Sequence, residues 1–255
     1  MIPPNDRGLL LGDGLFETLL ALDGQVRHVE AHLDRMAAGC LALGLPPLDR
    51  ERARGLILAA PGEAGLTSGR AAVRLTLTAG SGGRGLDRPE APVPVLLASC
   101  AAAPPAGAPA TAVVATVRRN EGSPASRLKT LAYLDNVLAR AEARAAGADE
   151  ALMLNNRGHL ACASAGNLFW LEGDVLATPA LGCGVLAGLA RGRIMAAAGG
   201  LGLTVREVHA GPEALPAASA AFLTNSLTGV RPLVSLDGRI LGADPRVAAL
   251  AAVAG

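Results

Sequence analysis

The sequence predicts an α+β fold, because stretches with the pattern of strands and of helices mix without a regular strand–helix–strand order. Several short stretches alternate apolar and polar side chains and are rich in β-branched residues, which is typical of strands, whereas others carry apolar residues at helical spacing. The chain has 255 residues, 51% of them hydrophobic, so it can bury a sizeable core in one large or two small domains. Aromatic residues make up only 2%, so Ala, Leu and Val must fill that core.

The first part of the chain is expected to hold four strands and two helices. Residues 9–29, LLLGDGLFETLLALDGQVRHV, are interpreted as two strands joined by a turn at Asp23 and Gly24, since Asp-Gly is a strong hairpin signal. Apolar spacing predicts helices at residues 30–45, EAHLDRMAAGCLALGL, and from Glu51 to Ala60. Two further strands are predicted at residues 71–80 and 93–100.

A linker is predicted at about residues 101–110, AAAPPAGAPA, which carry three prolines and no charge. We therefore expect a smaller N-terminal domain at residues 1–105 and a larger C-terminal domain at residues 111–255. The elements predicted in the second domain are strands at 111–119, 151–155, 167–173 and 220–226, a turn at 156–159 (NRGH), and helices from Leu131 to Ala146 and from Gly188 to Ala198.

Composition argues against several classes of protein. No run of about 18 apolar residues lacks a charge, Gly or Pro, and the first residues do not resemble a secretory signal, so we expect neither membrane insertion nor secretion but a cytoplasmic protein. The net charge is +1 and the arginines are scattered, which gives no support to nucleic-acid binding. The four cysteines lie far apart and form no CxxC pair, so neither a disulfide framework nor a metal site is expected.

Residues 126–136, SRLKTLAYLDN, contain the single lysine of the chain, Lys129, among 23 basic residues, and its single tyrosine, Tyr133. Arginine can replace lysine on solvated surfaces, but it cannot lose its proton and form a covalent bond to a carbonyl. The retained lysine therefore favours a reactive amine. A helix opening at Lys129, together with Arg127, would disfavour its ammonium form. The alternative is a surface lysine retained by chance.

Three other stretches complete a candidate site. In LAGLARGRI, Gly188 opens a predicted helix whose first amides have no partners within the helix, which is typical of an anion site. In FLTNSLTGVRP, a strand ends in three short polar side chains that would form a second anion site. In AHLDRM, Arg35 lies on an apolar helix face, where it needs an anionic partner. The ordinary alternatives are a plain helix start, a polar turn, and an ion pair of Arg35 with Asp34 or Glu30.

A reactive amine, two phosphate cradles and an arginine are the parts of a site for pyridoxal phosphate. The chain resembles the fold-type IV pyridoxal-phosphate enzymes, which include branched-chain aminotransferases, D-amino acid aminotransferases and aminodeoxychorismate lyases. The similarity runs in order from DRGLLLGDGLFET at residues 6–18 to TNSLTGVRP at 224–232. The resemblance implies the two-domain fold of D-amino acid aminotransferase, with the active site at the domain interface, and a homodimer whose glycine loop reaches the neighbouring site.

The resemblance also implies a role for individual residues. Lys129 matches the lysine that forms the Schiff base with the cofactor, and Arg35 matches the arginine that contacts its phosphate. Tyr133 is near the position that contacts the oxygen on the pyridine ring, and Asn167 matches the asparagine of the family's E-x-x-x-x-N-[LIV]-F stretch. The remaining phosphate contacts implied are the backbone amides of Leu189 and Ala190, where many aminotransferases have threonine at position 190, and Ser226 with Asn225 beside it.

One departure from the family pattern concerns the ring nitrogen of the cofactor. Five residues before Asn167 the family has a glutamate that pairs with the protonated nitrogen, whereas this chain has Cys162. A thiol, with an ordinary pKa of about 8.5, would face a neutral nitrogen and weaken the electron sink. Transamination should suffer most from that change, and elimination should suffer less, because the leaving group takes up the electrons. The alternatives are that activity has decayed or that another acid substitutes.

Among members of the family, the chain is most similar to the aminodeoxychorismate lyases. VRLTLTAGSGGRGL resembles their strand and glycine loop, although Ala79 replaces an arginine, and RLKTLAYL resembles their KTLNYL stretch, although Ala132 replaces an asparagine. The implied activity is elimination of pyruvate from 4-amino-4-deoxychorismate to give 4-aminobenzoate for folate synthesis. An aminotransferase of unknown substrate and a weakly active pyridoxal-phosphate-binding protein are the alternatives. The residues proposed to bind the substrate carboxylates are Arg84, Arg118 and Arg119.

Overall fold

The computed structural model describes residues 2–254, and these divide into two compact units. The first contains residues up to Pro104 together with Leu128–Ala132, and the second contains Pro105–Arg127 and the residues from Tyr133 onward. The segment that carries Lys129 therefore returns from the second unit to the first.

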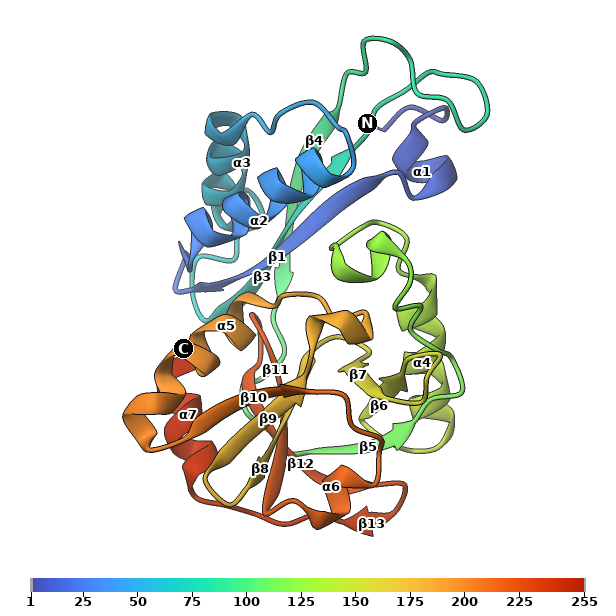
Figure 1. The fold of residues 1–255 in the computed structure, drawn as a ribbon. Coiled ribbons are helices and arrows are strands. Elements are labelled where there is room, and N and C mark those ends of the chain that lie inside the picture. Colours follow the sequence, from blue (N-terminus) through green and yellow to red (C-terminus); the bar gives the residue numbers. More distant parts are fainter. Residues whose placement is uncertain (1, 255) are drawn as a thin grey trace. The chain divides into compact units, whose positions relative to one another are not determined.

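The first unit is a four-stranded antiparallel sheet covered on one face by two helices (Figure 1). Its strand order is β2-β1-β3-β4, and Leu15 and Leu19 of β1 pack with Leu33 and Met36 of α2 in the core. The elements are α1 (Arg7–Leu11), β1 (Gly14–Leu22), β2 (Gln25–Val26), α2 (Val29–Ala42), α3 (Arg50–Glu63), β3 (Arg70–Thr78) and β4 (Val95–Ala102).

The predicted hairpin at Asp23 and Gly24 is confirmed, since these residues join β1 to β2 with φ values of 49° and 76°. Both central residues of the preferred two-residue hairpin turn need positive φ, which Asp tolerates and Gly adopts freely. The prediction is wrong at residues 9–11, which belong to the short helix α1. The Asp6 carboxylate accepts hydrogen bonds from the amides of Gly8 and Leu9 and starts that helix before the strand begins.

The second unit is built on a nine-stranded mixed sheet, with the order β10-β9-β8-β11-β12-β5-β6-β7 and β13 paired to β12. The strands are β5 (Ala110–Val114), β6 (Glu150–Leu154), β7 (Leu160–Ala163), β8 (Asn167–Glu172), β9 (Val175–Pro179), β10 (Thr204–Val208), β11 (Ala220–Asn225), β12 (Gly229–Leu236) and β13 (Arg239–Ile240). The helices are α4 (Leu134–Ala145), α5 (Leu189–Ala198), α6 (Ala214–Ala217) and α7 (Arg246–Ala254), with 3₁₀ turns at Pro124–Arg127, Leu181–Cys183 and Gly199–Leu201.

Hydrophobic clusters lie on both faces of the sheet of the second unit. Phe169 and Phe222 stack with their centroids 5.2 Å apart and pack with Ile194 and Ala198 of α5. Ala139 and Ala143 of α4 belong to a separate cluster with residues of β6 and β7. None of the helices in the described part of the chain has the length and apolar character needed to cross a membrane.

Three predicted boundaries in the second unit are wrong. The strand predicted at 111–119 ends at Val114, and the helix predicted from Leu131 begins only at Leu134. The turn at 156–159 leads into β7, which pairs with β6, and not into the strand at 167–173. β7 has only four residues, all buried, so it is too short to show an alternating pattern.

Candidate active site

Lys129 lies in the first unit beside the edge of β1. The Phe16 amide donates to the Lys129 carbonyl at 2.9 Å, and the Leu131 amide donates to the Gly14 carbonyl at 3.0 Å. These two bonds hold the lysine as a short extension of the sheet, with its Nζ atom 4.2 Å from the centroid of the Phe16 ring. The prediction that a helix opens at Lys129 is wrong, since α4 begins five residues later. A helix terminus therefore does not set the charge state of this amine.

Arg74 contacts the same aromatic ring, with its Cζ atom 3.8 Å from the Phe16 centroid. The register of β1 and β3 pairs Thr18 with Arg74, so Phe16, Thr18 and Arg74 share the face of the sheet opposite Leu15 and Leu19. Sequence reasoning missed Arg74 because an exposed arginine in an alternating strand is usually a solvated side chain.

Arg35 is held by a buried glutamate that sequence reasoning also missed. Its Nε and Nη2 atoms donate to the two carboxylate oxygens of Glu17 at 2.8 Å and 2.5 Å, and His32 Nδ1 lies 2.7 Å from Glu17 Oε2. The ordinary alternative, an ion pair of Arg35 with Asp34 or Glu30, is wrong, because those two residues pair with arginines of α3.

Glu17, Arg35 and His32 form a hydrogen-bonded network, called here the Glu17 network, and its charge state is defined. Burial alone would raise the pKa of Glu17, but the hydrogen bonds from Arg35 and His32 outweigh burial and hold that pKa below its ordinary value. Burial lowers the pKa of His32 despite the neighbouring carboxylate, with smaller contributions from the charges of Arg35 and Lys129. A neutral His32 therefore donates its Nδ1 proton to an ionised Glu17, which keeps the guanidinium of Arg35 in one orientation.

In the second unit, the start of α5 is the place where the sequence predicts an anion cradle. Gly188 is the N-cap, and no side chain caps the helix, so the first-turn amides of Leu189 and Ala190 are not satisfied by a cap. Asn167 Nδ2 donates to the Leu186 carbonyl at 2.9 Å and holds the segment that leads into the helix. A Cβ atom at Gly188 would lie 2.0 Å from Asn167 Oδ1, so this close approach requires glycine. Asn167 thus positions the cradle.

Thr224 adds a hydroxyl on the same face of the sheet. It pairs directly with Asn167 across β11 and β8, so the two side chains project to one side. Its Oγ1 atom is buried and has no hydrogen-bond partner within the described chain. Burying a hydroxyl without a partner costs about 1–3 kcal/mol. An oxyanion bound at the α5 cradle would satisfy it, which is the observation that tests the fit of a phosphate here.

Asn225, which the resemblance places beside a phosphate-binding hydroxyl, has its side chain hydrogen-bonded to the backbone. Its Oδ1 atom accepts from the amides of Leu227 and Thr228 and its Nδ2 atom donates to the Ala165 carbonyl, so it builds the turn between β11 and β12. Ser226 lies half-buried in that turn. Of the three polar side chains at this strand end, Thr224 is the one whose buried hydroxyl has no hydrogen-bond partner among the described residues.

Cys162 lies in β7 within the apolar cluster beside α4, paired in register with Met153 of β6. Burial raises the pKa of its thiol, partly offset by the charge of Arg119 and reinforced by the Glu150 carboxylate. The side chain therefore stays a neutral thiol near pH 7, as the sequence predicts for a group in place of the family glutamate.

Arg119 is buried, and each of its three guanidinium nitrogens donates to an oxygen of the protein. It donates to the carbonyls of Gly184 at 3.0 Å and Ser126 at 2.6 Å, and to Asn136 Oδ1 at 3.1 Å. These bonds connect Arg119 to the end of the turn at Gly184, to the 3₁₀ turn of Ser126 and to the start of α4, and they occupy the guanidinium. The other two arginines predicted to bind substrate, Arg84 and Arg118, are exposed, and Tyr133 is half-buried at the N-cap of α4.

The amino-transferase class IV model matches residues 14–236. The chain belongs to the class IV aminotransferase family. Among relatives, it is 31% identical to a provisionally assigned branched-chain-amino-acid aminotransferase of Methanocaldococcus jannaschii, over 92% of this chain and 83% of that protein. It is 27% identical to the aminodeoxychorismate lyase of Bacillus subtilis, over 93% and 82%. The solved 4-amino-4-deoxychorismate lyase of Pseudomonas aeruginosa is 31% identical, with a TM-score of 0.86 over 98% of this chain and 93% of that one.

Family membership confirms the predicted fold type and makes pyridoxal phosphate the cofactor. Each unit holds residues suited to it: Lys129 and the arginine held by Glu17 in the first, and the α5 cradle with Thr224 in the second. Sequence reasoning named Lys129, Arg35, the start of α5 and the strand end at Thr224 as candidates. It did not single out Glu17, His32 or Arg74, of which only Glu17 carried a signal, as a lone charge in an apolar strand.

Proposed function

We propose that the protein is a 4-amino-4-deoxychorismate lyase, which releases pyruvate and leaves 4-aminobenzoate. The observation that carries the proposal is Cys162, a buried thiol whose pKa is raised, at the position where the family has a glutamate. A neutral group at the ring nitrogen suits a reaction in which the leaving group removes the electrons. The similarity to two lyases over nearly the whole chain supports the same assignment.

Lys129 performs the proton transfers in this proposal. Pyridoxal phosphate, when bound, withdraws electrons from the carbon that carries the substrate amine. The freed Nζ of Lys129 removes the proton from that carbon as general base. The substrate ring becomes aromatic as the bond to the enolpyruvyl oxygen breaks, and Nζ or a water then protonates the methylene carbon to give pyruvate. The atoms and electrons balance without a second keto acid.

The cofactor phosphate is assigned to the α5 amides of Leu189 and Ala190 and to the hydroxyl of Thr224. Arg35, which Glu17 holds in the first unit, stays a proposal for binding an anion. Arg74 is a better candidate than Arg119 for binding a substrate carboxylate, because Arg74 and Lys129 both contact the Phe16 ring. Arg84 and Arg118 stay proposals for the second carboxylate.

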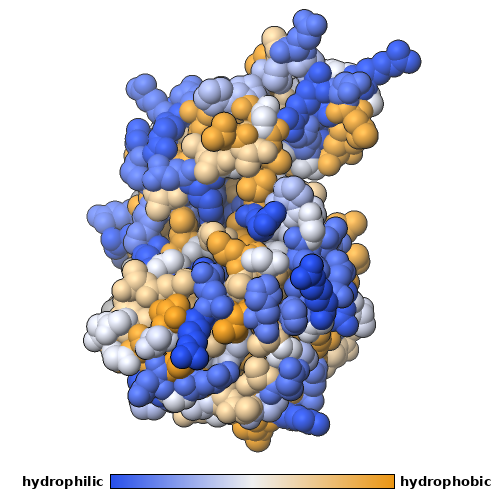
Figure 2. All heavy atoms as spheres, viewed as in Figure 1, coloured by the Kyte–Doolittle hydropathy of each residue, from blue (hydrophilic) through white to orange (hydrophobic). Residues whose placement is uncertain are grey.

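We also propose a homodimer. Three large apolar side chains of α4, Leu134, Val137 and Leu138, are 67%, 59% and 47% exposed at helical spacing. Leu9 and Leu10 of α1 are 64% and 63% exposed, and Figure 2 shows hydrophobic side chains over α1. A second copy covering such faces would remove them from water.

An aminotransferase is the second candidate, because two branched-chain enzymes match with 30–31% identity over 92% of the chain. The two activities differ in their need for an amino acceptor.

The test uses protein loaded with pyridoxal phosphate and aminodeoxychorismate generated enzymatically, with 4-aminobenzoate and pyruvate measured together. Release of both products at a rate independent of added keto acid, and its loss in Lys129→Ala, is the expected result. Products that appear only with a keto acid would favour the aminotransferase. Bound cofactor without turnover of this substrate or of any amino donor tested would favour a protein that acts by binding.

A further inference from the structure

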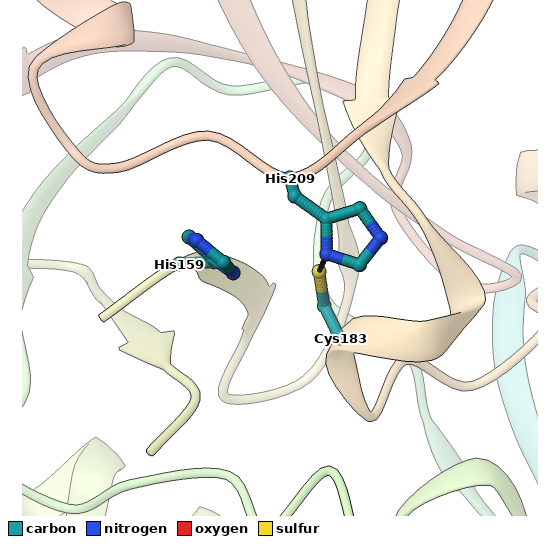
Figure 3. A group of neighbouring side chains, drawn as sticks. All are labelled: His159, Cys183 and His209. Carbon is teal, nitrogen blue, oxygen red and sulfur yellow. Dashed lines mark hydrogen bonds between the residues drawn. The ribbon is translucent and has the colours of Figure 1, made fainter. Parts of the chain in front are cut away.

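Three side chains outside the candidate active site converge in the second unit: His159, Cys183 and His209 (Figure 3). One donor atom from each lies within 4.8 Å of the other two. Among the described residues, no other group of three or more His, Cys, Asp or Glu side chains meets this condition. None of the three has a role in the proposed function.

Backbone hydrogen bonds hold the three segments side by side. The Leu160 amide donates to the Ala210 carbonyl at 2.8 Å, which sets the start of β7 beside the residue after His209. The Ala180 amide donates to the Val208 carbonyl at 3.0 Å, which sets the turn of Cys183 beside β10. His159 is fixed within its own turn, because its amide donates to Asn155 Oδ1 at 2.9 Å.

The donor geometry fits a tetrahedral ion. Cys183 Sγ lies 3.4 Å from His209 Nδ1. With metal–sulfur and metal–nitrogen distances of about 2.3 Å and about 2.05 Å, two tetrahedral zinc ligands would be about 3.6 Å apart. The ring of His159 is 5.5 Å from that of His209, at 79°, and its Nδ1 atom is buried without a hydrogen-bond partner. A small rotation of His159 would complete three ligand positions.

We propose that His159, Cys183 and His209 bind a zinc-type divalent transition metal ion, with a fourth position for water. A thiolate with two imidazoles selects zinc or cobalt over magnesium and calcium, which prefer oxygen ligands. Cys183 is fully buried, so it is poorly placed to act as a nucleophile on a dissolved substrate, whereas the exposed His209 gives an ion a path to the thiol.

The ion would join the residue before β7, the turn before α5 and the residue after β10, which are distant in sequence. It would stabilise the second unit, because an ion that binds only the folded chain adds its binding free energy to folding. Sequence reasoning excluded a metal site because the cysteines form no CxxC pair, but these ligands are 24 and 26 residues apart.

The experiment titrates cobalt into untagged, chelator-treated protein that carries its pyridoxal phosphate. One cobalt per chain is expected, with the visible d–d bands of a tetrahedral ion and a thiolate charge-transfer band, and zinc should displace it. Cys183→Ser should abolish the charge-transfer band and weaken zinc binding at least about 100-fold, which exceeds the effect usual for an outer-shell contact. His209→Ala changes an exposed side chain and tests the site without disturbing the core.

Cys100→Ser is the matched control, since Cys100 lies in the first unit, and it should bind as the parent does. Zinc should also raise the melting temperature of the parent and of Cys100→Ser, but not of His209→Ala. Absence of binding at micromolar metal, or equal binding by the parent and both ligand variants, would overturn the proposal and leave a thiol–histidine contact of the core.

Discussion

Replacing Glu17 with glutamine is expected to destabilise the protein strongly, although the two side chains have almost the same shape. Glu17 is 1% exposed and accepts two hydrogen bonds from Arg35 and one from His32. Breaking a buried ion pair from one side typically costs about 3–5 kcal/mol. Arg35 is 16% exposed and glutamine keeps one acceptor oxygen, so we expect about 2–4 kcal/mol, or a melting temperature lower by roughly 5–15 °C.

The assay is urea unfolding followed by far-ultraviolet circular dichroism, with Glu30→Gln as the matched control. Glu30 also pairs with two arginines, Arg50 and Arg54, but its side chain is 56% exposed, and exposed pairs contribute little. The two variants therefore make the same chemical change in buried and solvated surroundings. If Glu17→Gln were no less stable than Glu30→Gln, the Glu17 network would not hold Arg35 as described.

The remaining predictions concern acid, the phosphate cradle, the thiol and the dimer. The free energy of unfolding should fall as the pH drops below about 6.5, because His32 gains a proton in the unfolded chain but not in the folded one. It should fall further below about 4.5, because Glu17 likewise gains a proton only in the unfolded chain. Unfolding measured across this pH range checks both, and a stability that does not change with pH would contradict them. Thr224→Val should weaken pyridoxal-phosphate binding about 10–100-fold, as measured by equilibrium titration. The melting temperature of the cofactor-free protein should not fall. An unchanged affinity would mean that Thr224 does not contact the phosphate. Cys162→Glu should raise transamination relative to pyruvate release by at least about tenfold, measured with an amino donor and a keto acid, and an unchanged ratio would mean that the thiol does not tune the reaction. Leu138→Glu should shift a dimer to monomer in light scattering, and a parent protein that is already monomeric would refute the dimer.

Local patterns in the sequence predict much of the fold. The Asp23-Gly24 hairpin, α2 and the strand at β11 follow from turn chemistry and from apolar spacing, which act over a few residues. The start of α4 could not be predicted in the same way, because residues 128–132 leave the second unit to pair with β1. A contact made across the chain thus overrides the helical propensity of Leu131 and Ala132.

In the candidate site, too, local sequence patterns indicate some residues, whereas others depend on contacts between distant segments. Counting residue types indicates Lys129 as a candidate, and the glycine before an apolar helix indicates the start of α5. The partner of Arg35 was not found, because Glu17 is 18 residues away in another element whereas Glu30 is within reach on the same helix. The need of Thr224 for a partner also depends on burial, which only the folded chain determines.

Arg119 shows how the folded chain can use a residue that the sequence offers for binding. The sequence names it with Arg84 and Arg118 as a candidate for a substrate carboxylate, but the folded chain surrounds its guanidinium with two carbonyls and an amide oxygen. Its charge instead lies close enough to Cys162 to lower the pKa of that thiol slightly, against the larger effect of burial.

If the protein eliminates pyruvate without an amino acceptor, as proposed, it must turn over many times in the absence of any keto acid. Protein loaded with pyridoxal phosphate is incubated with an excess of aminodeoxychorismate, and both products are counted per chain. Equal amounts of 4-aminobenzoate and pyruvate, far exceeding one per chain, are expected. A yield that stops at or below one per chain and resumes only when a keto acid is added would contradict the proposal.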